Sequence, residues 1–236
     1  WFVYASPSDI TSDTPLASGT TGAGVTTADV SGLMPQTNYD FYVSSDCDVD
    51  GQSILAGPST FTTGCAVKIP DYEENFDSFL PDCWNEAGSG DPTTGPSDIG
   101  TGFWGADGFL NNGFSGSARI NLYTDNREDW LLSPGFDLSG GTYELVFDIG
   151  ITAFSGNGDS PMGSDDEVQL LYSEDGGTTW VNLQTWAQGT EPSNAGEKLT
   201  YDLSAITAAN VQFAFWGTDG IVDDSEDYNI YIDNFE

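Results

Sequence analysis

Short runs of aromatic and β-branched residues, separated by glycine and proline, constrain the fold of this chain more than any other feature. The runs cover residues 1–5, 39–45, 59–63, 143–151, 167–173, 179–186, 211–217 and 228–235. Almost no segment has a helical pattern, and the 29 glycines and 11 prolines supply frequent turn signals. Short runs of this composition, bounded by turn residues, predict an all-β sandwich.

The amount of apolar material bounds the size of the core. Of the 236 residues, 38% are hydrophobic and 13% are aromatic, which suffices for one large core or two smaller ones. No apolar stretch approaches the ~20 residues that a membrane-spanning helix needs. The chain opens directly on a strand-like run without a signal pattern, so we interpret it as a mature or excised fragment.

The charge balance argues against several classes of partner. The chain has 38 acidic residues and a formal net charge of −34, and its four bases are Lys68, Arg119, Arg127 and Lys198. Such a field repels phosphate and anionic lipid, so we expect no nucleic acid partner and no membrane insertion. A strongly negative surface suits a salty medium, where repulsion is screened, or a medium rich in divalent cations.

The same imbalance decides how a buried acid can exist in this chain. Four bases can pair with only a few of the 38 acids. A carboxylate that is buried without a partner is very costly. An acid within a core strand must therefore accept hydrogen bonds from backbone N–H groups or hydroxyls, bind a metal, or carry a proton.

The absence of histidine removes several catalytic chemistries. It excludes Ser-His-Asp and Cys-His nucleophile pairs within this chain, and also zinc sites built on histidine. Paired carboxylates could hydrolyse a glycoside, but among 38 acids some pair will have almost any spacing. We therefore expect no enzymatic activity.

Residues 1–65 resemble part of a fibronectin type III domain. The resemblance is carried by VSGLMPQTNYDFYVSSDC and the following GPSTFTT, where Leu33, Pro35, Thr37 and Tyr39 fit the L-x-P-x-T-x-Y turn of that family. It implies that Tyr39 enters the penultimate strand and ties it to the preceding loop. The first two strands of the family are absent here, so the domain is either truncated or completed by an upstream segment.

Residues 66–236 resemble the MAM-like jelly-roll domains of secreted Bacteroidetes proteins. The matching segments are residues 74–84, 95–104, 129–150, 173–180 and 228–236. The resemblance implies an antiparallel jelly-roll β-sandwich, often with a bound cation, in an adhesion or accessory role. It brings no catalytic residues with it.

The three cysteines, Cys47, Cys65 and Cys83, fit no zinc pattern. The resemblance to a type III domain implies that Cys47 and Cys65 lie at opposite ends of that domain, too far apart to bridge. We therefore predict a Cys65–Cys83 disulfide, which would attach the linker at 66–72 to the second domain. Cys47 would then pair with a cysteine in the missing first strand of the type III domain or remain a free, structural thiol.

Residues 46–51, DCDVDG, place Asp46, Asp48 and Asp50 at alternate positions before a glycine. This is the first half of an EF-hand-type calcium loop, but Gly57 stands where the bidentate glutamate should be. A metal loop at these residues, which would be a second metal site of the chain, would bind its ion weakly. The alternative is an acidic hairpin turn between two strands.

The closing segment, residues 221–236, contains two kinds of acid. Asp223, Asp224, Glu226 and Asp227 form a run that we expect to be solvated, with at most one of them reaching a metal. Asp233 instead lies inside an apolar run, and by strand alternation it shares a face with Tyr231 and Phe235.

A hard cation such as Ca²⁺ would neutralise several such acids at once. The jelly-roll resemblance implies a cation near the first and last strands. The candidate ligands for this predicted site are Glu73, Glu74, Asp77, Asp107 and Asp233. The alternative is that Asp233 accepts hydrogen bonds from backbone N–H groups or tyrosine hydroxyls. The polar segment 155–167 either binds an ion or is a solvated loop.

Flat aromatic faces can stack on sugars, and Trp104, Trp186 and Trp216 lie near glycine-rich or loop segments. They are candidate carbohydrate contacts, although core packing is the default expectation for each.

We expect a non-catalytic, extracellular adhesion or recognition module of a larger secreted or cell-surface bacterial protein, stabilised by calcium. Its partners would be a surface or extracellular protein, a polysaccharide, or other domains of the parent chain. The alternatives are a carbohydrate-binding accessory module of a secreted enzyme and a structural spacer.

Overall fold

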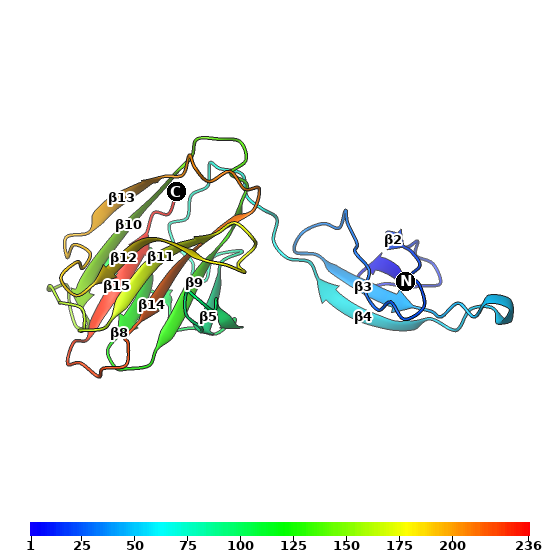
Figure 1. Cartoon of the computed structure of the whole chain (residues 1–236), viewed down its shortest axis with the longest axis horizontal. Helices are drawn as coiled ribbons and strands as arrows, with labels where there is room; N and C mark the ends of the chain where they lie inside the picture. Colours follow the sequence, from blue (N-terminus) through cyan, green and yellow to red (C-terminus); the bar gives the residue numbers. More distant parts are fainter. The chain divides into compact units, whose positions relative to one another are not determined.

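A computed structural model describes residues 1–236 and divides into two compact units, Trp1–Ala66 and Val67–Glu236 (Figure 1). The sequence predicts the domain boundary between residues 65 and 66. Regular structure is almost entirely β, and the exceptions are two short 3-10 helices, η1 (Asp48–Asp50) and η2 (Phe109–Asn111). Neither is long or apolar enough to cross a membrane.

The first unit is built on one antiparallel sheet of four strands, in the order β2-β1-β3-β4. The strands are β1 (Phe2–Ala5), β2 (Ala17–Ser18), β3 (Asn38–Val43) and β4 (Ala56–Thr62). Tyr39 is buried in β3, and its hydroxyl accepts a hydrogen bond from the backbone N–H of Met34 at 2.7 Å. Tyr39 thus ties β3 to the preceding loop, as the turn pattern in the sequence implied.

The second unit is an antiparallel β-sandwich. One sheet has the order β13-β10-β15-β8-β7 and the other β12-β11-β14-β9-β5-β6. The strands are β5 (Asn85–Ser89), β6 (Ser97–Ile99), β7 (Gly105–Ala106), β8 (Ala118–Leu122), β9 (Glu128–Phe136), β10 (Glu144–Ala153), β11 (Glu167–Ser173), β12 (Val181–Ala187), β13 (Glu197–Asp202), β14 (Val211–Thr218) and β15 (Tyr228–Asp233). The orders β13-β10-β15-β8 and β12-β11-β14-β9 are those of a jelly roll, which confirms the expected fold class.

The main core lies between the two sheets and is made by alternate residues of their strands. Ile230 and Ile232 of β15 and Phe147 of β10 face Leu131 of β9 and Phe215 of β14 across the sandwich. All five side chains are fully buried. Because the period of a strand is two, the intervening residues of β15 point to the opposite face of its sheet.

A second, smaller cluster lies on the outer face of the six-stranded sheet. It contains Trp130 of β9 and Trp216 of β14, with Trp180 packed against them. The indole N–H groups of Trp130 and Trp216 both donate to the carbonyl of Gly90, at 2.7 and 3.0 Å. The turn after β5 therefore closes over this face.

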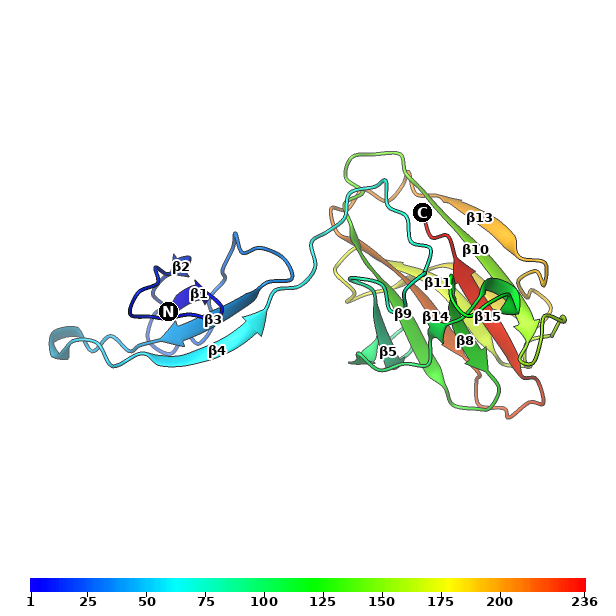
Figure 2. The same cartoon turned by 180° about the vertical axis from the view of Figure 1, so that it is seen from behind.

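Three loops meet at one end of the sandwich, which we call the loop end: residues 123–127, 154–166 and 219–227. They follow β8, β10 and β14, whose last residues are brought together by the strand pairing. The loop end lies at the lower left of Figure 1 and the lower right of Figure 2.

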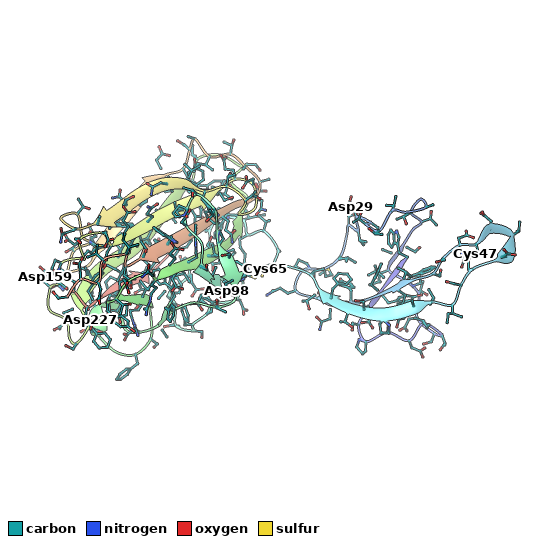
Figure 3. The ribbon with its side chains drawn as sticks, turned by 60° about the horizontal axis from the view of Figure 1, so that its bottom comes forward. Asp29, Cys47, Cys65, Asp98, Asp159 and Asp227 are labelled. Carbon is teal, nitrogen blue, oxygen red and sulfur yellow. The ribbon has the colours of Figure 1, made fainter.

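The cysteines are in two different states. Cys65 and Cys83 are both disulfide-bonded, so the predicted disulfide is present. Cys47 is a free and exposed thiol in the connection between β3 and β4 (Figure 3).

Candidate functional site

Asp233 is half-buried at the end of β15, opposite Asp148 of β10. The backbone N–H of Asn234 donates to its Oδ1 at 2.6 Å. Burial raises the pKa of Asp233 to about 6; the Asn234 hydrogen bond lowers it, and the negative charges of Asp148 and Asp77 raise it further. A backbone donor, one of the alternatives considered for this acid, is therefore present.

The expectation that Asp233 shares a face with Phe235 is wrong. Asn234 has a φ of 47°, in the left-handed region, and this breaks the strand alternation. Phe235 consequently turns into the main core, whereas Tyr231 packs on the other face against Phe109 of η2.

The first segment of the second unit does lie beside its last strand. Glu74 exchanges backbone hydrogen bonds with Phe235, at 2.8 and 2.9 Å. The carboxylate of Glu74 accepts the backbone N–H of Phe76 at 2.9 Å, and Glu73 and Asp77 are exposed. The Oδ2 atom of Asp107 lies 3.4 Å from Nε of Arg119, so this acid is paired with a base.

The three acids that lie close enough together to hold an ion are found elsewhere, at the loop end. The carboxylate oxygens of Asp165, Asp166 and Asp224 lie within 4.8 Å of one another. We call these residues the acid cluster. Asp165 and Asp166 belong to the loop after β10, and Asp224 belongs to the loop before β15. The five ligands predicted around Asp233 form no such group.

Backbone and hydroxyl donors hold each member of the acid cluster in place. Asp165 Oδ2 accepts the N–H groups of Ile221 and Val222, at 2.9 and 3.2 Å, while its Oδ1 is buried without a partner. Asp224 accepts the N–H of Ser164. The backbone hydrogen bond from Ser164 lowers the pKa of Asp224.

Asp166 is the most deeply buried member of the acid cluster. Its Oδ2 accepts the N–H of Gly163 at 3.1 Å and the hydroxyl of Tyr228 at 2.6 Å. Burial raises the pKa of Asp166; the donors Tyr228 and Gly163 lower it, and the nearby charges of Asp219 and Asp165 raise it. Three carboxylates in such a small volume suit a hard divalent cation with oxygen ligands.

The half EF-hand loop is an exposed turn. Asp46, Asp48 and Asp50 are all exposed, and Asp46 Oδ1 accepts the backbone N–H of Asp48 at 3.1 Å. Their carboxylates do not converge into a group of three. The hairpin turn, the alternative to a metal loop, describes this geometry.

The three tryptophans considered as carbohydrate contacts are core residues. Trp104 and Trp186 belong to the main core and Trp216 to the smaller cluster, with at most 6% of each side chain exposed. None of these indole faces is open to a ligand, so the default expectation for these residues holds.

Phe103 and Tyr123, which are 57% and 44% exposed, are two of the exposed aromatic residues and share one cation. The guanidinium carbon of Arg127 lies 4.0 Å from the ring centroid of Phe103 and 4.8 Å from that of Tyr123. Arg127 Nη1 also donates to the carbonyl of Asn121 at 2.7 Å. We call Phe103, Tyr123 and Arg127 the aromatic platform, in which cation–π contacts fix both rings.

Asp219 and Gly220 connect the aromatic platform to the acid cluster. Asp219 is buried, and its Oδ1 accepts the backbone N–H of Arg127 at 2.7 Å. A Cβ atom added at Gly220 would collide with the carboxylate of Asp165. Asp159 and Asp227, labelled in Figure 3, mark two of the loops at this end.

No motif in the sequence pointed to the platform, whereas both parts of the acid cluster lie in segments for which a metal was left open, 155–167 and the acidic run at 223–227, without being joined. Phe103 lies 20 residues before Tyr123, and nothing in the sequence brings them together. One available signal was that Arg127, among only four bases, follows Tyr123 by four residues. In the acid cluster, 58 residues separate Asp166 from Asp224, so only the strand order brings them into contact.

Comparisons with known proteins find fold similarity without a family. No protein-family model and no curated protein matches the chain. Among solved structures, TmCBM61 in complex with β-1,4-galactotriose has 15% identity and a TM-score of 0.39, covering 67% of this chain and 88% of its own.

Two further structures show a similar degree of likeness. The K3 cleaved adhesin domain of Lys-gingipain from Porphyromonas gingivalis W83 has 17% identity and a TM-score of 0.44, covering 70% of this chain and 97% of its own. A carbohydrate-binding module of the β-sandwich superfamily has 14% identity and a TM-score of 0.43, covering 85% of this chain and 72% of its own. Similarity at this level leaves the ligand to be inferred from the residues of the chain itself.

Proposed function

We propose that residues 67–236 form a non-catalytic carbohydrate-binding module of an extracellular protein, with the aromatic platform as its ligand site. The observation that carries the proposal is the pair of exposed rings of Phe103 and Tyr123, fixed on one guanidinium. The disulfide of Cys65 and Cys83 supports an oxidising compartment outside the cytosol.

The chemistry of the platform matches that of a sugar ring. The C–H face of a pyranose is apolar and packs against an aromatic ring, while its hydroxyls need donors and acceptors at the edge. Arg127 supplies donors, and the exposed Asp125 beside it supplies acceptors. The rings are already fixed, so binding costs less side-chain entropy than it would with free rotamers.

Affinity electrophoresis of the full chain through a panel of neutral and acidic polysaccharides tests this proposal. We expect the wild type to be retarded by at least one polysaccharide. Phe103→Ala and Tyr123→Ala should each be retarded less, with a Kd at least about tenfold higher. Phe114→Ala is the matched control, because Phe114 is 94% exposed but lies outside the platform. Free migration of the wild type on every polysaccharide, or equal retardation of all three variants, would refute the assignment.

We also propose that Ca²⁺ binds at the acid cluster and holds the loop after β10 against the loop before β15. The support is the approach of three carboxylates to within 4.8 Å and the unpartnered Oδ1 of Asp165. The predicted site around Asp233 remains the competing location.

Isothermal titration of the EDTA-treated chain with CaCl₂ separates the two locations. We expect saturable binding that is lost in Asp224→Asn and kept in Asp77→Asn, since Asp77 is exposed at the opposite end of β15. The reverse pattern would place the ion beside Asp233. No binding heat and no change in Tm would contradict both locations.

A further inference from the structure

A buried pair of acids lies directly under the loop that carries Phe103. Asp129 of β9 is 0% exposed, and its Oδ2 makes no hydrogen bond. Glu86 of β5 is half-buried, and its Oε1 is also buried without a partner. Neither oxygen has the donor that a buried carboxylate requires.

The two carboxylates lie on either side of Gly102. A Cβ atom built at Gly102 would lie 2.7 Å from Glu86 Oε1 and 2.9 Å from Asp129 Oδ1. The segment 100–104 is held against both acids, because Phe103 N–H donates to Asp129 Oδ1 at 2.8 Å and Gly100 N–H donates to the carbonyl of Glu86 at 2.8 Å. A side chain at position 102 would occupy the space between the carboxylates.

The charges around Asp129 do not neutralise it. Arg127, in the loop before β9, is the nearby base, but its guanidinium stacks on Phe103 and donates to Asn121. Glu86 on β5 and Asp219 after β14 add negative charge. Opposite Asp129 on β14 is Gly217, which has no charge to offer.

Desolvation decides the protonation of this pair. Burial raises the pKa of Asp129 to about 7; the Phe103 hydrogen bond and Arg127 lower it, and Glu86 and Asp219 raise it. Burial also raises the pKa of Glu86. The ionised form of Asp129 is therefore disfavoured while the segment above it stays closed.

We propose that Asp129 carries a proton in the folded chain, and that this proton is a latch that keeps segment 100–104, with Phe103, closed over β5 and β9. Loss of the proton places two negative charges across Gly102 without a cation between them. The unpartnered oxygens, Glu86 Oε1 and Asp129 Oδ2, are buried, so water can solvate them only when segment 100–104 moves away, and deprotonation favours opening.

The sign of the pH dependence follows from the two states of Asp129. In the open segment Asp129 is solvated and titrates near 3.8, whereas in the closed segment its pKa is about 7. The closed form therefore binds the proton more tightly. The opening equilibrium should rise about tenfold per pH unit between roughly pH 4 and pH 7, and level off above pH 7.

Hydrogen exchange of the full chain, followed by mass spectrometry from pH 5 to pH 8, tests the latch. After correction for intrinsic exchange rates, we expect the wild-type peptide that contains 100–104 to open at least tenfold more often at pH 7 than at pH 5. Asp129→Asn, which is neutral at every pH, should give a flat and protected profile. Glu86→Gln should reduce the rise by removing the repulsion.

The matched control is Asp125→Asn, which removes an exposed acid from the neighbouring loop and should keep the wild-type profile. A flat wild-type profile, or an undiminished rise in Asp129→Asn, would overturn the proposal. A wild-type rise that appears only in EDTA would also overturn it, because a cation would then neutralise the pair. The readout needs no ligand, so the outcome for the latch is independent of whether the platform binds a polysaccharide.

Discussion

At the scale of single residues, this chain accommodates buried acids in opposite ways. Asp40 of β3 is buried, yet the Ser8 and Thr60 hydroxyls and the Ser8 N–H donate to it at 2.7, 2.8 and 2.9 Å. The hydroxyl of Ser8, followed by that of Thr60, lowers the pKa of Asp40 to about 2. Asp129 has one backbone donor, and its pKa is raised instead. Hydrogen-bond donors outweigh desolvation at Asp40, whereas desolvation outweighs the single donor at Asp129.

Replacing Asp40 should therefore affect the first unit in a pH-dependent manner. Because the folded pKa of Asp40 lies below its ordinary value of 3.8, its stabilising effect is present above about pH 4 and disappears as the pH falls through about 2. We expect Asp40→Asn to reduce hydrogen-exchange protection of residues 38–43 at pH 6, with a difference that shrinks towards pH 2.

Asp29→Asn, at an exposed position of the same unit, serves as the control for loss of one charge and should leave the protection unchanged. A difference between wild type and Asp40→Asn that is constant from pH 6 to pH 2 would contradict the role assigned to the ionised carboxylate.

At the scale of elements, the sequence predicts strands such as β11 and β14 but not β9, although β9 carries Trp130 and Phe136. Residues 167–173 coincide with β11, and residues 211–217 nearly coincide with β14. β8, with the sequence ARINL, and β13, with EKLTYD, were not among the expected runs. Strand β13 lies at the edge of its sheet with alternate residues exposed, so its charged residues are tolerated there.

The loops are harder to predict, because their geometry depends on single left-handed residues and on the strand order. Asn234 reverses the expected face of Phe235 through its φ of 47°. The acid cluster forms because β10, β11, β14 and β15 end or begin at the same edge of the sandwich. Neither property has a periodic signal in the sequence.

Gly220, in the loop between β14 and β15, provides a test of this loop geometry. Its φ is +63°, and an added Cβ would meet the carboxylate of Asp165. Gly220→Ala should lower the free energy of unfolding by more than the ~1–2 kcal/mol that a left-handed alanine costs, and it should weaken Ca²⁺ binding. Urea denaturation and calcium titration measure the two effects.

Gly189→Ala measures the cost of a left-handed alanine without a collision, since Gly189 has a φ of +85° and nothing lies within 4 Å of an added Cβ. Equal losses of stability in the two variants, with calcium binding unchanged in both, would show that the contact with Asp165 is unimportant.

At the scale of the whole molecule, repulsion between carboxylates is the main electrostatic effect, because acids greatly outnumber bases. The chain has a formal net charge of −34, and the structure contains two side-chain ion pairs, Arg119–Asp107 and Lys198–Glu236. Repulsion among exposed carboxylates destabilises the folded state and is screened by salt, with a Debye length of about 30 Å at 0.01 M and about 10 Å at 0.1 M. The composition alone therefore predicts a salt-dependent stability.

Raising NaCl from 10 mM to 500 mM should increase the Tm of the EDTA-treated chain by at least ~2–4 °C, which corresponds to about 1 kcal/mol for a protein of this size. Differential scanning calorimetry measures the shift, and KCl should give the same value if the effect is screening. A Tm that is insensitive to both salts, or that falls, would contradict the role of repulsion.

The carbonyl of Gly90, which accepts hydrogen bonds from two indole N–H groups, limits which positions of the second unit can be substituted without disturbing the fold. It covers Trp130 and Trp216 on the outer face of the six-stranded sheet, so these two side chains contribute to folding and not to binding. Under the proposed function, recognition is then left to short loops at the edge of the sandwich. Phe103 and Tyr123 lie outside both hydrophobic clusters, so relatives of this chain can acquire a new ligand through substitutions there without repacking the interior.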